Sequence, residues 1–101
     1  MVKFENLKVG KIYKYKGSYN NEVWFMPDKV VERIVFVLIQ KHPDECWQED
    51  VLFIDFFNSK EIYEANEEEI KLVKKGLVEY IEVERHYLNK IEKLINDTNW
   101  N

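Results

Sequence analysis

Four potential metal ligands lie within five residues of one another near the middle of the chain: His42, Asp44, Glu45 and Cys46. Zinc sites use such side chains, but they need about four ligands that converge from fixed spacings. Here Pro43 interrupts the group, and the segment offers only one sulfur ligand. A solvated loop before a strand is therefore the preferred interpretation, and we predict no metal site and no cofactor.

Arrangements that could support catalysis are equally weak. Cys46 could act as a nucleophile with His42 or His86 as its base, but no third residue is placed to orient that base. Adjacent carboxylates such as Glu49 and Asp50 could serve as general acid and base only across a cleft. The three glycines match no phosphate-binding loop. We therefore predict no catalytic residues and a protein that is not an enzyme; an unrecognised active site is the last of three hypotheses.

The segment 11–16 mixes lysine with aromatic residues, a mixture that nucleic-acid-binding surfaces also use. In a strand, however, the tyrosines would face the core while Lys14 and Lys16 face outward, so they would not form one platform. The chain carries a net charge of −4, whereas nucleic-acid-binding proteins are usually basic. Nucleic acid is therefore an unlikely partner.

The composition is that of one folded domain. The chain has 101 residues, of which 46% are apolar and 34% are charged. A single cysteine excludes an internal disulfide and fits a reducing compartment. The longest apolar run covers only 34–39, whereas a transmembrane helix needs about 20 residues, and the N-terminus lacks the apolar core of a signal peptide. We expect a cytoplasmic protein with no membrane contact.

Aromatic and β-branched residues dominate the part before Asn66, which we predict to be β-rich. The expected strands cover 11–16, 22–26, 30–40, 50–57 and 60–64. A turn at 27–29 should separate the second strand from the third. The third should be central, because both its faces are apolar from Ile34 onward. Short links imply antiparallel neighbours, so we predict an α+β fold with four or five antiparallel strands.

The stretch 4–13, FENLKVGKIY, resembles the opening of SH3-like small barrels. Such barrels often begin with a short approach segment, a glycine, and a first strand rich in lysine and tyrosine. The resemblance implies a rolled five-strand barrel and implies nothing about activity.

From Asn66 onward the apolar period becomes helical. Asn66 and Glu69 have the spacing of a capping box. The apolar stripe comprises Ile70, Val73, Leu77, Ile81, Leu88, Ile91 and Ile95, and Tyr80, Val83, Tyr87 and Leu94 widen it.

A helix over 66–97 would be longer than its own β-domain is wide, unless Gly76 breaks it. We therefore predict that it projects and mediates assembly into a homo-oligomer, or binds a target protein. The expected oligomerisation residues are Leu77, Ile81, Leu88 and Ile91.

Charge is distributed unevenly along the chain. Residues 1–16 contain five lysines and one acidic residue, whereas 44–69 contains ten acidic residues and one lysine. Carboxylates on a rigid surface can imitate the phosphates of DNA and so occupy a basic groove on another protein, although acidic surfaces also simply keep proteins soluble. The tryptophans of the chain are also candidates for a binding surface, because tryptophan and tyrosine are enriched at binding hot spots.

These features favour a non-enzymatic protein-binding module, such as a phage-type inhibitor or adaptor. The alternative is a small-ligand or nucleotide-binding protein with a pocket between sheet and helix or between subunits. The expected protein-binding residues are Trp24, Trp47, Glu49, Asp50, Glu61, Glu64, Glu67 and Glu68.

Overall fold

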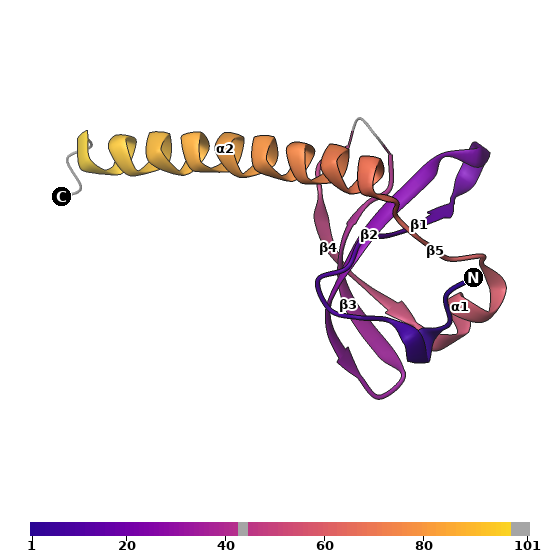
Figure 1. The fold of residues 1–101 in the computed structure, drawn as a ribbon. Helices are drawn as coiled ribbons and strands as arrows, with labels where there is room; N and C mark the ends of the chain where they lie inside the picture. The colour runs from indigo at the N-terminus through magenta and orange to yellow at the C-terminus, as the bar shows by residue number, and fades with distance from the viewer. Residues whose placement is uncertain (43–44, 98–101) are drawn as a thin grey trace.

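The structure is a computed structural model, and it describes residues 1–42 and 45–97. One five-stranded antiparallel sheet is followed by a long helix (Figure 1), which confirms the predicted α+β class. The elements in chain order are η1 (Phe4–Asn6), β1 (Tyr13–Lys16), η2 (Ser18–Asn20), β2 (Glu22–Val31), β3 (Ile34–Gln40), β4 (Gln48–Phe53), α1 (Ile54–Ser59), β5 (Tyr63–Glu64) and α2 (Glu67–Asp97).

The strands lie in the order β4-β3-β2-β1-β5, so β4 and β5 form the two edges of the sheet. The sheet is open, and the closed barrel suggested by residues 4–13 does not form. The physical reason is the size of β5. It has only two residues, which pair with Tyr13 and Lys14 of β1. A strand this short is not long enough to reach β4 and close the sheet.

The turn predicted at 27–29 is wrong, because β2 continues to Val31. A register shift between Pro27 and Lys29 absorbs the proline, as bulges commonly do. The chain reverses instead after Val31, which pairs with Ile34, and Glu32 in this turn has a φ of 52°. Two-residue hairpin turns of this kind favour asparagine or glycine. Glutamate is not a residue that indicates such a turn, and the sequence therefore predicts 30–40 as one strand.

The strand predicted over 50–57 is also wrong in its second half. β4 ends at Phe53, and the next residues form the short helix α1. Helical geometry lets Phe57 enter the core, where its ring contacts Phe4 and Phe25 with centroid distances of 5.4 and 6.1 Å. This long-range packing outweighs the local β-propensity of the segment. The last predicted strand, 60–64, shortens to β5.

The main core lies on one face of the sheet and is rich in aromatic rings. Phe25 is completely buried at its centre, and its ring stacks on Tyr13 with a centroid distance of 5.5 Å. Tyr15 and Phe57 also pack against Phe25. Partly buried residues of the N-terminal segment, among them Phe4, pack against the same core. The predicted inward orientation of Tyr13 and Tyr15 is confirmed.

A second, smaller cluster forms where α2 meets the sheet. Val73 of α2 packs there with Ile12, Trp47 and Ala65. Ile70 and Leu77 pack against the same cluster from neighbouring turns of the helix. Among the described residues, the apolar cluster that joins the sheet to α2 covers the first three turns of that helix.

α2 is one helix of 31 residues that runs through Gly76 without a break (Figure 1). Its far half extends beyond the sheet, as predicted. The molecule measures 56 × 31 × 25 Å, and its radius of gyration is 16.9 Å, whereas a compact domain of 100 residues has about 13 Å. Within the described ranges, no helix has both the length and the apolar content needed to cross a membrane.

Gly76→Ala is expected to stabilise the protein by about 1 kcal/mol, because glycine is a poor helix former and a Cβ at this position would meet no atom within 4 Å. Urea unfolding followed by circular dichroism measures the change. Gly17→Ala is the contrasting control, since its Cβ would lie 2.7 Å from Val23 Cγ2 and should destabilise the protein. A loss of stability in Gly76→Ala would contradict this account of the helix.

Candidate functional site

The acidic residues predicted to bind a partner do not lie together. Glu49 and Asp50 belong to β4, at one edge of the sheet. Glu61 and Glu64 lie just before and within β5, at the opposite edge. The other two, Glu67 and Glu68, are exposed in the first turn of α2. The acidic span is therefore divided between both edges of the sheet and does not form one continuous surface.

Lysines within the chain already engage two of these carboxylates. Lys11 Nζ lies 2.6 Å from Glu64, and its hydrogen bond and charge lower the pKa of that carboxyl. Lys41 Nζ lies 3.2 Å from Asp50, whose pKa is lowered mainly by the backbone N–H of Val51. Lys11 and Lys41 therefore partly neutralise the acidic span.

The two tryptophans predicted as anchors lie near α2. Trp47 is buried beneath the helix, with 4% of its surface exposed. Trp24 is half-buried, and Lys14 Nζ lies 5.7 Å from the centroid of its ring. Both side chains contribute to packing between sheet and helix.

Most residues considered for metal binding or catalysis can be located in the structure. Cys46 and Glu45 are exposed, and Asp44 lies outside the described residues. His86 is exposed on the polar side of α2. In the part of the chain that is described, no three His, Cys, Asp or Glu side chains are grouped closely enough to hold a metal ion.

A groove of about 570 Å³ lies beside β1, between the start of β2 and the segment that leads from α1 into α2. It forms because β5 covers the edge of β1 only at Tyr13 and Lys14, which leaves the end of β1 uncovered. Lys16 and Glu22 line it from one side and Lys60, Glu61 and Tyr63 from the other. Lys16 and Glu22 form an ion pair at 3.5 Å. Sequence reasoning missed this groove, since no local signal shows that β5 is short.

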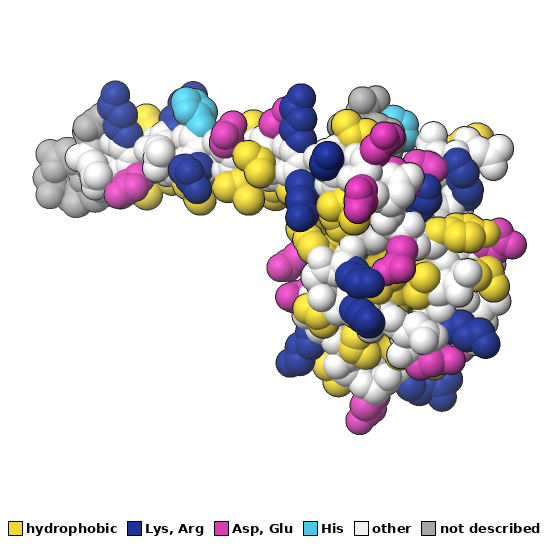
Figure 2. Space-filling view, viewed as in Figure 1, with side chains coloured by type: hydrophobic (Ala, Val, Ile, Leu, Met, Phe, Trp, Pro, Cys, Tyr) yellow, Lys and Arg dark blue, Asp and Glu magenta, His cyan; other side chains and the backbone are white. Residues whose placement is uncertain are grey.

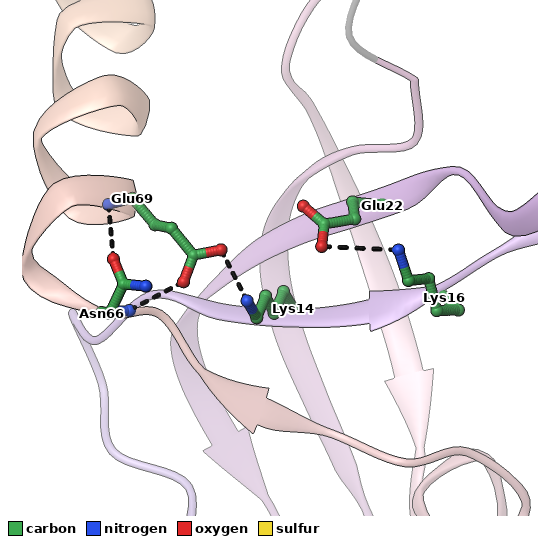
Figure 3. A network of polar contacts seen from close by, with 5 residues as sticks. All are labelled: Lys14, Lys16, Glu22, Asn66 and Glu69. Carbon is green, nitrogen blue, oxygen red and sulfur yellow. Dashed lines mark hydrogen bonds and ion pairs between the residues drawn. The ribbon is translucent and has the colours of Figure 1, made fainter.

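The start of α2 is fixed by a network of three side chains (Figure 3). Asn66 Oδ1 accepts a hydrogen bond from the Glu69 N–H at 2.8 Å, and Glu69 Oε1 accepts one from the Asn66 N–H at 3.0 Å. This confirms the predicted capping box. Lys14 Nζ, on β1, donates to Glu69 Oε2 at 2.6 Å. The network therefore joins the helix cap to the sheet and constrains the direction in which α2 leaves it.

Glu69→Gln is expected to lower the free energy of unfolding by about 1–2 kcal/mol at pH 7. Partial burial acts to raise the pKa of Glu69, but hydrogen bonds from Lys14 and Asn66 and the charge of Lys14 outweigh it, so the pKa is lowered. A lowered native pKa stabilises the fold above the unfolded pKa, and this contribution is lost as the pH falls through the native value.

Urea titrations at several pH values measure this effect. The difference between wild type and Glu69→Gln should shrink as the pH falls below the unfolded pKa of about 4.3, and it should vanish below the lowered native pKa, where the carboxyl is protonated in both states. Glu68→Gln, in the same turn but exposed, is the control and should change little at any pH. A difference that does not depend on pH would show that the charge of Glu69 is not responsible.

The apolar stripe that packs on the sheet continues along α2 as an exposed surface (Figure 2). Ile81 is 51% exposed, Val83 66%, Tyr87 59% and Leu88 60%. We call residues Ile81, Val83, Tyr87, Leu88, Ile91, Leu94 and Ile95 the distal stripe. Of the four predicted oligomerisation residues, Leu77 packs against the sheet cluster, while Ile81, Leu88 and Ile91 belong to the distal stripe.

Comparison with known proteins adds no assignment to these features. No protein-family model matches the chain, and no curated protein or solved structure matches it. Function is therefore inferred from the geometry of the chain.

Proposed function

We propose that the protein is a binding module that joins another protein chain through the distal stripe of α2. The observation that carries this proposal is the exposure of the stripe. At least four large apolar side chains, at positions 81, 83, 87 and 88, are each more than half exposed on about two turns of one helix. Contiguous apolar surface of this kind marks interaction sites on soluble proteins.

The helix itself supports the same proposal. Most of the stability of a helix in a protein comes from packing of its apolar side. Within the part of the chain that the structure describes, the cluster that packs α2 on the sheet extends as far as Leu77. The 20 residues of α2 after Leu77 would gain comparable packing from a protein that covers the distal stripe.

In this proposal the sheet is the scaffold that positions the binding helix. The Asn66–Glu69–Lys14 network and the cluster around Val73 fix both the start and the direction of α2. A binding element that is held in position loses less conformational entropy when it associates. An inhibitor or adaptor that engages its target through α2 fits this arrangement better than one that relies on the divided acidic span.

Immobilised protein tests the proposal. Wild type, Leu88→Glu and Asn89→Glu are presented to a soluble tagged copy of the chain and to a lysate of its source cells. Leu88→Glu places a charge in the distal stripe, and Asn89→Glu adds the same charge one residue later on the polar side of the helix. We expect wild type and Asn89→Glu to retain the same partner and Leu88→Glu to lose it. Equal retention by all three baits would refute the proposal.

A second candidate function is the binding of a small ligand in the groove beside β1. Its volume of about 570 Å³ lies within the range of roughly 300–1,000 Å³ that ligand pockets occupy. Lysines and carboxylates line it together, which suits a ligand that carries both signs of charge. Native mass spectrometry of gently purified protein tests this function. It should show a small molecule bound to wild type, and a smaller fraction of bound protein for Lys60→Glu.

A further inference from the structure

We propose that the occupant of the distal stripe is a second copy of this chain, packed antiparallel so that the two sheets lie at opposite ends of a helix pair. This inference rests on the proposed function and names its partner. It follows from three features of α2: the side on which the sheet sits, the position of Glu84, and the placement of two opposite charges beside the stripe.

The position of the sheet excludes a parallel, in-register pair. Ile70, Val73 and Leu77 pack on the sheet with the same side of α2 that carries the distal stripe. In a parallel pair this side of each helix would face its copy along the whole length, so both sheets would need the same space (Figure 1). An antiparallel pair places each sheet beyond the far end of the other helix, and the distal stripes remain accessible to each other.

Glu84 gives an independent argument for the antiparallel orientation. It lies between Ile81 and Leu88 at spacings of three and four residues, and therefore within the stripe. A parallel pair would place Glu84 directly against Glu84 of the second copy, and two like charges at such a seam are destabilising. An antiparallel pair centred between Leu88 and Asn89 separates the two carboxylates by about 14 Å along the axis, at 1.5 Å per residue.

Charge complementarity favours a second copy over an unrelated protein. Arg85 and Glu92 each follow a stripe residue, Ile81 or Leu88, by four positions, so both lie along the same edge of the stripe. In a twofold antiparallel pair that edge meets its own copy. Arg85 and Glu92 lie equally far before and after a centre between Leu88 and Asn89, so in that register Arg85 of one copy lies level with Glu92 of the other. Symmetry forms this pair twice.

The expected affinity is modest. Pairing over 81–95 covers about 21 Å of helix. A specific interface begins near 1,000 Å² of total buried surface, and a helix pair of this length lies at that lower end. We therefore expect a dimer with a dissociation constant on the order of micromolar.

Sedimentation equilibrium at low ionic strength tests the inference on the full chain. We expect wild type to dimerise, and Arg85→Glu and Glu92→Arg each to weaken the dimer by about tenfold or more, because each turns two attractive pairs into two repulsive ones. The double exchange, Arg85→Glu with Glu92→Arg, should restore the affinity. Lys93→Glu, which makes the same charge change as Arg85→Glu on the polar side of α2, should leave it unchanged.

Each outcome decides between clear alternatives. Restoration by the double exchange requires the two positions to meet across the interface, so a dimer without restoration overturns the antiparallel arrangement. Wild type that stays monomeric at several hundred micromolar overturns the dimer. If wild type is monomeric but Leu88→Glu still abolishes capture of a different protein, the proposed function stands. If wild type is monomeric and Leu88→Glu has no effect on capture, the proposed function is also refuted. Circular dichroism of each variant confirms that α2 is retained.

Discussion

Val73→Asp is expected to destabilise the protein by several kcal/mol and to detach α2 from the sheet. Val73 is 7% exposed and packs with Ile12, Trp47 and Ala65 in the cluster that joins the helix to the sheet. The described chain holds no buried charged side chain that could pair with the new carboxylate. An unpaired charge in such a site either remains at high cost or draws water into the interface.

Leu72→Asp is the matched control, because it introduces the same charge one residue earlier at a position that is 71% exposed. It should change the free energy of unfolding by less than about 0.5 kcal/mol. Urea unfolding monitored by tryptophan fluorescence measures both variants, and Trp47 should become solvent-exposed only in Val73→Asp. Similar stabilities for the two variants would show that the contact between α2 and the sheet contributes little.

Phe25→Ala is expected to cost about 3–5 kcal/mol of stability, the range for removing a fully buried aromatic ring. Phe25 is 0% exposed, and its ring packs against Tyr13, Tyr15 and Phe57. The loss would leave a cavity between rings that come from β1 and from α1. Those elements are held by the rest of the fold and would close such a cavity only partly.

Phe53→Ala makes the same substitution at the end of β4, where the side chain is 61% exposed. It should cost much less, because most of that ring already contacts water. Thermal unfolding of the two variants gives the comparison, and the total stability of a domain of this size is only about 5–15 kcal/mol. Phe25→Ala should therefore lower the melting temperature by tens of degrees or prevent folding, and a small shift would contradict the central role of this ring.

Local sequence signals predicted those parts of the fold that local physics determines. The alternation in 11–16 placed Tyr13 and Tyr15 in the core, and the spacing of Asn66 and Glu69 located the start of α2. The turn at Glu32 and the helix α1 were not predictable in this way. Glu32 adopts a positive φ without the residue type that usually signals it, and α1 exists because Phe57 packs against rings distant in sequence.

The candidate site divides along the same line. The distal stripe follows from helical periodicity, so the sequence predicted it together with its excess length. The acidic span was contiguous in sequence but lies on two edges, because strand order places β4 and β5 at opposite ends of the sheet. The contact between Lys14 and Glu69 joins residues 55 positions apart and depends on the pairing of β1 with β5. Only tertiary structure determines these placements.

A straight helix that is held at one end acts as a lever arm. The residues of α2 beyond Leu77 extend about 30 Å, so a rotation of 10° at the attachment moves the far end by about 5 Å. The ion pair between Lys14 and Glu69 lies at the pivot. Any rotation at this attachment is therefore amplified at the far end of α2, without any change in the surface that binds.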